Sequence, residues 1–149
     1  MDAYVLPGMR VLDLGTGTGI LALSAAKLGA GHVTAVDTDE NAITAARRNI
    51  QHNGAQDCID LRLGSLADVE GTYDLILANI LAPIIISMVE SGLAARLHPG
   101  GLLVVSGILI EQMEDVQAAL DSHGLVVSGS QQKDDWVALS ARLKTSTLV

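Results

Sequence analysis

The residue types best suited to chemistry lie in the glycine-rich segment D-L-G-T-G-T-G at 13–19, which follows an apolar run and precedes a predicted helix. Glycine lets the backbone turn sharply and approach a ligand without a Cβ in the way, and a helix start offers free N–H groups. The glycine spacing is G-x-G-x-G, whereas dinucleotide sites use G-x-G-x-x-G. A carboxylate at position 13 would repel a pyrophosphate and is well placed to meet a ligand ammonium. The segment therefore predicts a site for S-adenosylmethionine, which carries an ammonium and no phosphate, with a plain strand-to-helix turn as the alternative. The predicted cofactor-binding residues are Asp13, Gly15, Thr16, Gly17 and Gly19.

A second carboxylate extends this site at the end of the next predicted strand. Asp37 lies 18 positions after Gly19, and an acidic residue about 20 positions beyond such a loop can accept hydrogen bonds from both ribose hydroxyls. Asp39 can cap the following helix, so Asp37 is not needed as a cap. We therefore predict that Asp37 binds the ribose and that Thr38 lines the same pocket.

The third predicted strand ends at Gly64 and Ser65. Their position places them beside the adenine ring, where a backbone N–H and the Ser65 hydroxyl would contact a ring edge. Asp68 lies close by in the sequence, so which group reads the adenine stays open. A simple turn is the alternative for this segment.

Asn79 ends the fourth predicted strand. An amide placed there, beside a sulfonium, can accept a hydrogen bond from an incoming amine and orient its lone pair. Methyl transfer is an in-line displacement, so positioning and electrostatics supply most of the catalysis. Since no general base is evident, either burial lowers the pKa of the amine or water takes its proton. We predict that Asn79 is catalytic and also binds the cofactor, with capping of the next helix as the alternative.

Two further features lie on later predicted strands. Ser106 and Gly107 end the fifth strand and are expected to border the substrate mouth. Trp136 starts the last strand, where a single aromatic side chain usually belongs to the core.

The elements that position these residues alternate between strand and helix. The strands at 10–14, 32–36, 59–63, 73–80 and 102–106 are mostly apolar throughout, which is typical of a parallel sheet buried on both faces. Helices are expected at 20–28, from residue 39 to about 52, from 83 to about 97, and at 111–123, with a Pro-Gly-Gly turn at 99–101. The segments 125–128 and 136–143 flank a polar stretch at 130–135 that is too short for a helix, so they predict an antiparallel hairpin. The pattern predicts a seven-stranded, mostly parallel, doubly wound α/β sheet with a C-terminal hairpin, and a ligand over the carboxyl ends of its central strands.

The composition argues against several classes of function. The 149 residues suit one domain, 1–149, and the 17 acidic against 9 basic residues give a net charge of −8. This balance offers no basic surface for phosphates, so a direct nucleic-acid partner is not expected. The single Cys58 and the four scattered histidines give no metal-ligand pattern. The longest apolar stretch, 75–89, is too short to span a membrane, and no signal peptide is evident, so we expect a cytoplasmic protein without a membrane partner.

The sequence resembles the methyltransferases that modify large-subunit ribosomal protein eleven on lysine side chains and on its N-terminal amine. The segments that carry the resemblance are V-L-D-L-G-T-G-T-G-I-L-A at 11–22, A-V-D-T-D at 35–39, G-S-L at 64–66, D-L-I-L-A-N-I-L-A at 74–82, P-G-G at 99–101, S-G-I-L at 106–109 and W-V-A-L at 136–139. The first two are shared by the wider methyltransferase superfamily, and those around Asn79, Ser106 and Trp136 are more specific. They cover nearly the whole chain in the same order.

The resemblance implies a Rossmann-like methyltransferase fold, S-adenosylmethionine as cofactor, and a ribosomal protein as substrate. It implies that Gly15, Thr16, Gly17, Asp37 and Asn79 contact the cofactor, with Asn79 nearest the transferred methyl. The family's separate N-terminal substrate-recognition domain has no counterpart here, so we expect a single catalytic domain. The remaining alternatives are a non-catalytic or small-molecule-directed cofactor-binding domain and, against the glycine spacing, a dinucleotide-dependent oxidoreductase.

Overall fold

A computed structural model describes residues 4–145, which form a single seven-stranded sheet in the order β3-β2-β1-β4-β5-β7-β6. The strands are β1 (Arg10–Leu14), β2 (His32–Asp37), β3 (Ile59–Leu63), β4 (Tyr73–Asn79), β5 (Leu97–Leu109), β6 (Leu125–Lys133) and β7 (Trp136–Leu143). The first five are parallel, whereas β7 lies antiparallel between β5 and β6. This confirms the predicted sheet and its terminal hairpin. The chain order reverses beside β1, whose neighbours are β2 and β4, so the carboxyl ends of these strands form the expected ligand edge.

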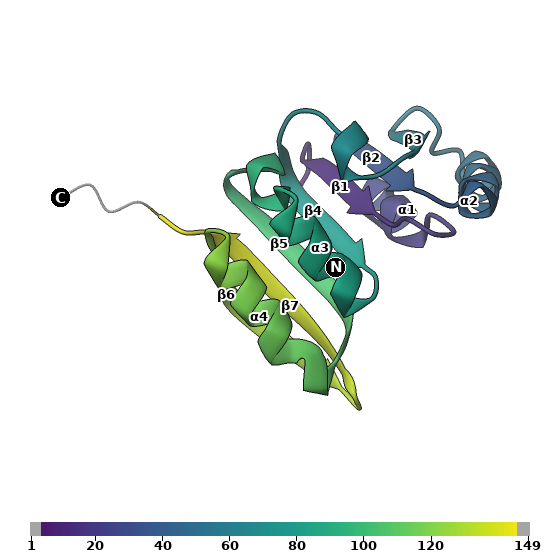
Figure 1. The fold of residues 1–149 in the computed structure, drawn as a ribbon. Coiled ribbons are helices and arrows are strands. Elements are labelled where there is room, and N and C mark those ends of the chain that lie inside the picture. The colour runs from purple at the N-terminus through teal and green to yellow at the C-terminus, as the bar shows by residue number, and fades with distance from the viewer. Residues whose placement is uncertain (1–3, 146–149) are drawn as a thin grey trace.

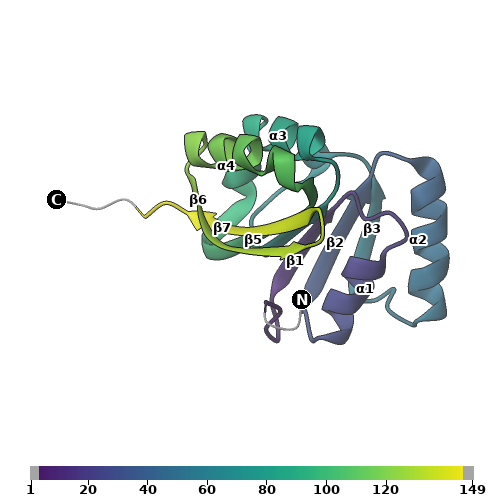
Figure 2. The ribbon, with the colours of Figure 1, turned by 90° about the horizontal axis from the view of Figure 1, so that it is seen from below.

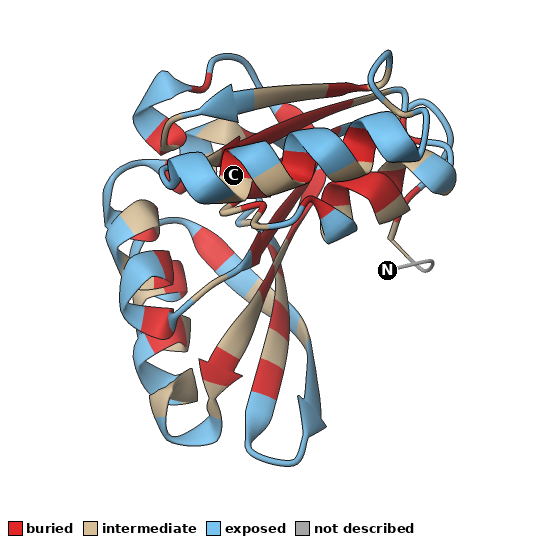
Figure 3. Cartoon of the chain, turned by 90° about the vertical axis from the view of Figure 1, so that its right-hand side faces the viewer, coloured by how far each residue is buried: buried red, intermediate tan, exposed pale blue. Residues whose placement is uncertain are grey.

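Helices cover both faces of the sheet (Figures 1 and 2). The helices are α1 (Ile20–Lys27), α2 (Glu40–His52), α3 (Ala82–Glu90) and α4 (Met113–Ser122). Helices α3 and α4 pack with the apolar side chains of one face, and α1 and α2 share a second cluster on the opposite face. The alternation of buried and exposed positions along α2 and α4 follows from their one-sided packing (Figure 3). The sheet between the two clusters holds the strand ends in fixed register.

Local signals explain where several helices begin and end. Asp39 caps α2, because its carboxylate accepts a hydrogen bond from the Asn41 amide at 2.9 Å. Pro83 lies in the first turn of α3, where its missing N–H costs nothing. Gly92, with a φ of 101°, separates α3 from a short 3-10 helix at Leu93–Arg96. The predicted single helix from 83 to about 97 is therefore wrong at its C-terminal half.

Three other boundaries differ from the prediction. Strand β5 begins at Leu97 and includes the Pro-Gly-Gly segment, which lies in a break of the register with β4: Leu97 pairs with Tyr73, and pairing resumes at Leu102 opposite Leu75. Helix α4 starts at Met113, after a 3-10 turn at Ile110–Gln112. Strand β6 continues through polar residues to Lys133, because its partner β7 is long enough to pair with them. The hairpin loop is thus only residues 134–135.

Residues 4–145 contain neither a candidate membrane-spanning helix nor a candidate metal site. No helix within residues 4–145 has the length and apolar character needed to cross a membrane. No group of three or more His, Cys, Asp or Glu side chains in that range is arranged to hold a metal ion.

Candidate functional site

The glycine-rich loop joins the end of β1 to the start of α1. Its glycines adopt left-handed backbone angles, with φ values of 69° at Gly15, 57° at Gly17 and 85° at Gly19. A Cβ at Gly15 would lie 2.6 Å from the Ile80 side chain, and one at Gly19 would lie 3.3 Å from Ala46, whereas one at Gly17 would meet no atom within 4 Å. Packing as well as backbone angle therefore disfavours a side chain at Gly15, a Cβ at Gly19 would be tight against Ala46, and Gly17 faces open space.

Asp37 is fixed against this loop. Its Oδ2 accepts a hydrogen bond from the Gly17 amide at 2.9 Å, and its Oδ1 accepts one from the Asp39 amide at 3.0 Å. The carboxylate is half-buried at the end of β2, next to the open side of Gly17. Since Asp39 caps α2, the interpretation of Asp37 as a helix cap is excluded. Thr38 is exposed beside it.

The loop amides are already used within the chain. The amides of Gly15 and Thr16 both donate to the Val36 carbonyl at 2.9 Å, and the Gly19 amide donates to the Thr16 carbonyl at 2.9 Å. Together with the Gly17 amide, which is bound to Asp37, four of the loop amides are thus bonded within the chain. A pyrophosphate site needs such N–H groups free to face the anion. The geometry therefore disfavours a dinucleotide at this loop, in agreement with the glycine spacing.

Asp13 lies beneath the loop, with only 1% of its surface exposed. Its Oδ2 accepts a hydrogen bond from the Thr16 hydroxyl at 2.7 Å, while Oδ1 has no hydrogen-bond partner among residues 4–145. Burial raises the pKa of Asp13 to about 6, and the hydrogen bond from Thr16 acts in the opposite direction. Because the loop covers the carboxylate, a direct contact with a ligand ammonium stays a prediction.

Gly64 and Ser65 lie beside Asp37. The Gly64 amide donates to the Asp37 carbonyl at 2.9 Å, which joins the ends of β2 and β3. Ser65 caps a 3-10 turn at Leu66–Asp68, and its amide donates to the Asp68 carboxylate at 2.9 Å. Asp68 is thus held by this turn. The segment thus has the geometry of a simple turn, which was the alternative to an adenine site. Its contact with adenine stays a prediction.

Asn79 ends β4 with an exposed side chain. Helix α3 takes its N-cap from Leu81, so Asn79 does not cap it. Gly107 of β5 approaches closely, because a Cβ added there would lie 3.0 Å from the Asn79 Oδ1 and 2.8 Å from the Ile80 carbonyl oxygen. Gly107 has a φ of 82° and belongs to a register shift between β5 and β7. The irregular end of β5 therefore makes room for the Asn79 amide.

An open groove of about 680 Å³ lies at this amide. It is lined by Asn79, Ile80, Leu81, Ile84, Ser106, Gly107 and Trp136. The expectation that Ser106 and Gly107 border a mouth is consistent with their place in it. The expectation that Trp136 belongs to the core is wrong, because 51% of the residue is exposed. Trp136 opens β7 opposite Leu109, at the very end of β5. The alternation in β7, in which Val137 and Leu139 are the buried positions, is the sequence signal that places Trp136 on the other face.

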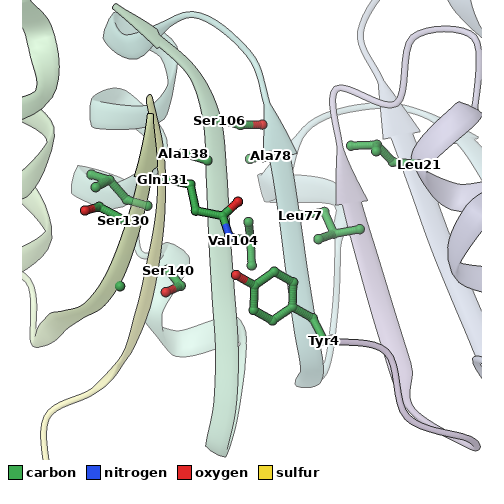
Figure 4. Close-up of a pocket in the computed structure, with 12 residues that line it drawn as sticks. Tyr4, Leu21, Leu77, Ala78, Val104, Ser106, Ser130, Gln131, Ala138 and Ser140 are labelled. Atoms are coloured by element: carbon green, nitrogen blue, oxygen red, sulfur yellow. The ribbon is translucent and has the colours of Figure 1, made fainter. Parts of the chain in front are cut away.

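A second, smaller hollow of about 300 Å³ shares Ser106 with the groove and runs over β4, β5 and the hairpin on the α1 side of the sheet. Tyr4 and Gln131 point into it above Val104 (Figure 4). Its lining mixes apolar residues such as Leu77 with serine hydroxyls. Sequence reasoning did not identify this hollow, because its residues come from six separate segments with no motif.

These observations fit a cationic amino-acid nucleoside as cofactor. The open side of Gly17 leaves space for a ligand, and Asp37 holds a carboxylate at its edge. The buried Asp13 has an oxygen with no hydrogen-bond partner among residues 4–145. Two carboxylates, together with four loop amides that are already bonded within the chain, suit an ammonium and hydroxyl groups, and they oppose a phosphate.

The family model described as "Ribosomal protein L11 methyltransferase (PrmA)" matches residues 1–144. The relative named Ribosomal protein L11 methyltransferase in Symbiobacterium thermophilum is 44% identical over 142 residues, covering 95% of this chain and 46% of that protein. The protein of the same name in Pelotomaculum thermopropionicum is 44% identical over 145 residues, covering 97% of this chain and 47% of that protein. The chain thus spans about half the length of these curated relatives.

Solved structures agree with the fold. A crystal structure of the ribosomal protein L11 methylase from Lactobacillus delbrueckii subsp. bulgaricus superimposes with a TM-score of 0.92 at 35% identity, covering 97% of this chain and 74% of that one. A putative methyltransferase from Thermoplasma acidophilum gives a TM-score of 0.78 at 20% identity, covering 95% of this chain and 70% of that one, which is a likeness of fold alone.

Proposed function

Because this chain belongs to the ribosomal protein L11 methyltransferase family, we propose that it transfers methyl groups from S-adenosylmethionine to amines of a protein, namely a ribosomal protein in the cytoplasm. The acceptor is a lysine side chain or an N-terminal amine. When bound, the cofactor supplies an electrophilic methyl group on a sulfonium centre. The observation that carries the proposal is the Asp37 carboxylate, fixed at 2.9 Å from the Gly17 amide beside the open side of the loop.

In this proposal the cofactor-binding residues lie together at the carboxyl ends of the parallel strands. Asp37 accepts hydrogen bonds from the ribose hydroxyls with lone pairs that the two backbone amides leave free, and Thr38 lines the same end. Asp13 balances the ligand ammonium from beneath Gly15, Thr16, Gly17 and Gly19. Gly64 and Ser65 border the adenine, since the Gly64 amide is bonded to the Asp37 carbonyl.

Asn79 is the residue that we assign to the reaction itself. Its Oδ1 accepts an N–H from the neutral acceptor amine and thereby directs the nitrogen lone pair into the groove, where positioning lowers the barrier. Because Gly107 has no side chain, the Asn79 amide can lie close to the end of β5. The apolar groove walls favour the neutral form of the amine, because desolvation disfavours the charged one. Water at the open groove takes the proton.

Two measurements on the same protein test the proposal. Isothermal titration should give binding of S-adenosylmethionine and S-adenosylhomocysteine and none of NAD. Transfer of labelled methyl groups to isolated ribosomal proteins should fall at least about tenfold in Asn79→Ala, because positioning of the acceptor is lost. The exposed Asn41 on α2 offers a matched control, and Asn41→Ala should retain full transfer.

The outcomes separate the competing functions. Binding of the cofactor without transfer to any amine would favour a non-catalytic binding domain. Binding of NAD in place of S-adenosylhomocysteine would overturn the cofactor assignment and favour an oxidoreductase. Equal transfer by Asn79→Ala and the wild-type protein would remove Asn79 from the reaction while leaving the activity in place.

A further inference from the structure

The buried carboxyl at the end of β1 has an oxygen that the fold itself does not use. Only 1% of Asp13 is exposed, its Oδ2 accepts a hydrogen bond from the Thr16 hydroxyl at 2.7 Å, and its Oδ1 has no hydrogen-bond partner among residues 4–145. A buried carboxylate ion without enough partners costs far more free energy than the neutral acid. Asp13 therefore holds its proton more tightly than an exposed aspartate does.

The charged group that acts on Asp13 is a second carboxylate. Asp37, at the end of the neighbouring β2, adds negative charge and so opposes the ionisation of Asp13. On the other side of Asp13, β4 contributes the apolar Leu77, and Tyr4 lies over Val104 in the adjoining hollow. The other titratable side chains of β1, β2, β4 and α1 lie toward the opposite ends of these elements, and they are Arg10, Lys27, His32, Tyr73 and Asp74. None of these four elements therefore places a cation beside the two carboxylates.

The glycine-rich loop separates this carboxyl from the open side of the site. Asp13 lies beneath the loop, whereas a Cβ added at Gly17 would meet no atom within 4 Å. The cofactor in the proposed function brings an ammonium and a sulfonium to this loop. An opposite charge within about 4–6 Å lowers the pKa of a carboxyl by about one to three units. A cation placed over the loop therefore drives Asp13 toward its ionised form.

We propose that Asp13 releases a proton when the cofactor binds, so that this carboxyl makes cofactor affinity rise with pH and distinguishes the cationic cofactor from its spent form. The inference rests on the proposed function and deepens it. Methyl transfer converts the sulfonium into an uncharged thioether, so S-adenosylhomocysteine keeps the ammonium and has one positive charge fewer. The proton passes to the solvent when S-adenosylmethionine binds, and a proton returns to Asp13 when the product leaves. Asp13 thus responds to the charge of its ligand from beneath the loop.

The affinity for the cofactor should therefore depend on pH in a defined direction. Burial raises the pKa of Asp13 to about 6 before a ligand binds. Below that value binding must first remove the proton, which weakens the affinity, whereas above it the carboxylate is already formed. For a ligand that lowers this pKa by about one to three units, the affinity should increase about five- to tenfold from pH 5 to pH 7 and then level off. The α-amine of the ligand has an ordinary pKa of about 8, so it stays charged over this range.

Calorimetric titration measures the released proton directly. At each pH the heat of binding is measured in two buffers of different ionisation enthalpy, and the difference gives the number of protons exchanged. Binding of S-adenosylmethionine should release about 0.4–0.5 proton at pH 6 and about 0.1 proton at pH 7. S-adenosylhomocysteine should release fewer protons at pH 6, and adenosine, which has neither the ammonium nor the sulfonium, should release none. No release with S-adenosylmethionine, or an equal release with adenosine, would overturn the proposal.

A substitution at Asp13 assigns the proton to this group. Asp13→Asn removes the titrating carboxyl and keeps an oxygen that can accept from Thr16. Its affinity for S-adenosylmethionine should change less than about twofold between pH 5 and pH 7, and its proton release at pH 6 should vanish. Asp57→Asn, at an exposed turn residue away from the site, is the matched control and should keep the wild-type pH dependence. A wild-type pH dependence in Asp13→Asn would assign the proton to another group and contradict the proposal.

Thr16→Val gives a second test that keeps the Asp13 carboxyl, whether or not Asp13→Asn folds. The Thr16 hydroxyl lowers the pKa of Asp13 by donating a hydrogen bond to it, so its loss should move the rise in affinity to higher pH. A rise at unchanged or lower pH would count against Asp13 as the titrating group.

The same titrations keep this inference apart from the proposed function. Binding of S-adenosylmethionine with the same affinity at pH 5, 6 and 7 would refute the proton release and leave the proposed function in place. No binding of S-adenosylmethionine or S-adenosylhomocysteine at any of these pH values would refute both.

Discussion

The buried carboxylate of Asp13 makes the stability of the fold depend on pH in a direction opposite to that of an ordinary ion-paired acid. Burial raises its pKa from 3.8 to about 6. Between these two values the folded chain keeps a proton that the unfolded chain has lost. The free energy of unfolding therefore falls as pH rises through this window, and the loss is complete above pH 6. Asp13→Asn removes the titration and keeps an oxygen that can accept from Thr16.

The magnitude follows from the shift of about two units. One unit corresponds to roughly 1.4 kcal/mol, so the full effect from below pH 3.8 to above pH 6 is roughly 3 kcal/mol. Of this, about 1.3 kcal/mol falls between pH 5 and pH 7.5, where the protein is easily studied. The asparagine introduces an N–H donor beside Thr16, and any cost of that donor is the same at both pH values. The difference between the two pH values therefore isolates the charge.

Urea unfolding at pH 5.0 and 7.5, without cofactor, measures this difference. The stability of Asp13→Asn relative to the wild-type protein should increase by about 1.3 kcal/mol on going to the higher pH. The exposed Asp57 lies in a turn away from the site, and Asp57→Asn should show no such change. A relative stability of Asp13→Asn that is the same at both pH values, or that falls with rising pH, would refute the reasoning.

Three further outcomes are expected from the same site. Asp37→Ala should weaken S-adenosylhomocysteine binding about ten- to hundredfold in titration calorimetry, since a hydrogen bond to a charged group contributes about 1.5–3 kcal/mol; an unchanged Kd would argue against the ribose role. Gly107→Ala should reduce methyl transfer strongly with little change in cofactor Kd, because its Cβ would meet Asn79 Oδ1 at 3.0 Å; full activity would contradict this. Gly15→Ala should lower the melting temperature more than Gly17→Ala, since only the former adds a 2.6 Å clash to the backbone strain; equal losses would show that backbone angle alone matters.

The sheet and its order of elements were predictable because their signals are local and strong. Glycine or asparagine at the predicted strand end marked four of the five parallel strands, whereas β2 ends at Asp37, and Asp39 and Pro83 marked two helix starts. The errors lie where tertiary pairing overrides local preference. Strand β6 extends through serines and glutamines only because β7 offers partners for them. Strand β5 takes in the Pro-Gly-Gly segment because Leu97, before it, and Leu102, after it, both pair with β4.

The residues proposed to bind the cofactor were easier to predict from the sequence than the groove proposed for the acceptor amine. The loop at 13–19 and Asp37 are contiguous motifs whose spacing implies proximity, and the bond between Asp37 and Gly17 agrees with it. Burial of Asp13 was not predictable, because a strand-end carboxylate looks the same whether the loop covers or exposes it. The groove joins residues from β4, α3, β5 and β7, and no spacing along the chain encodes that meeting.

Three departures from the usual packing rules lie at the carboxyl ends of the central strands, although others, such as the exposed Leu6 and Val126 and the broken register around Gly100, lie elsewhere. A buried carboxylate with an oxygen that has no hydrogen-bond partner within residues 4–145 lies at the end of β1. A left-handed glycine that breaks the strand register lies at the end of β5, and an exposed tryptophan lies opposite that end in β7. Each is unfavourable for stability alone. Because natural sequences violate such rules chiefly at functional sites, their presence at this edge supports the proposed site. Strand β4, which carries Asn79, lies between β1 and β5, so the groove beside Asn79 and the glycine loop lie at the same edge of the sheet.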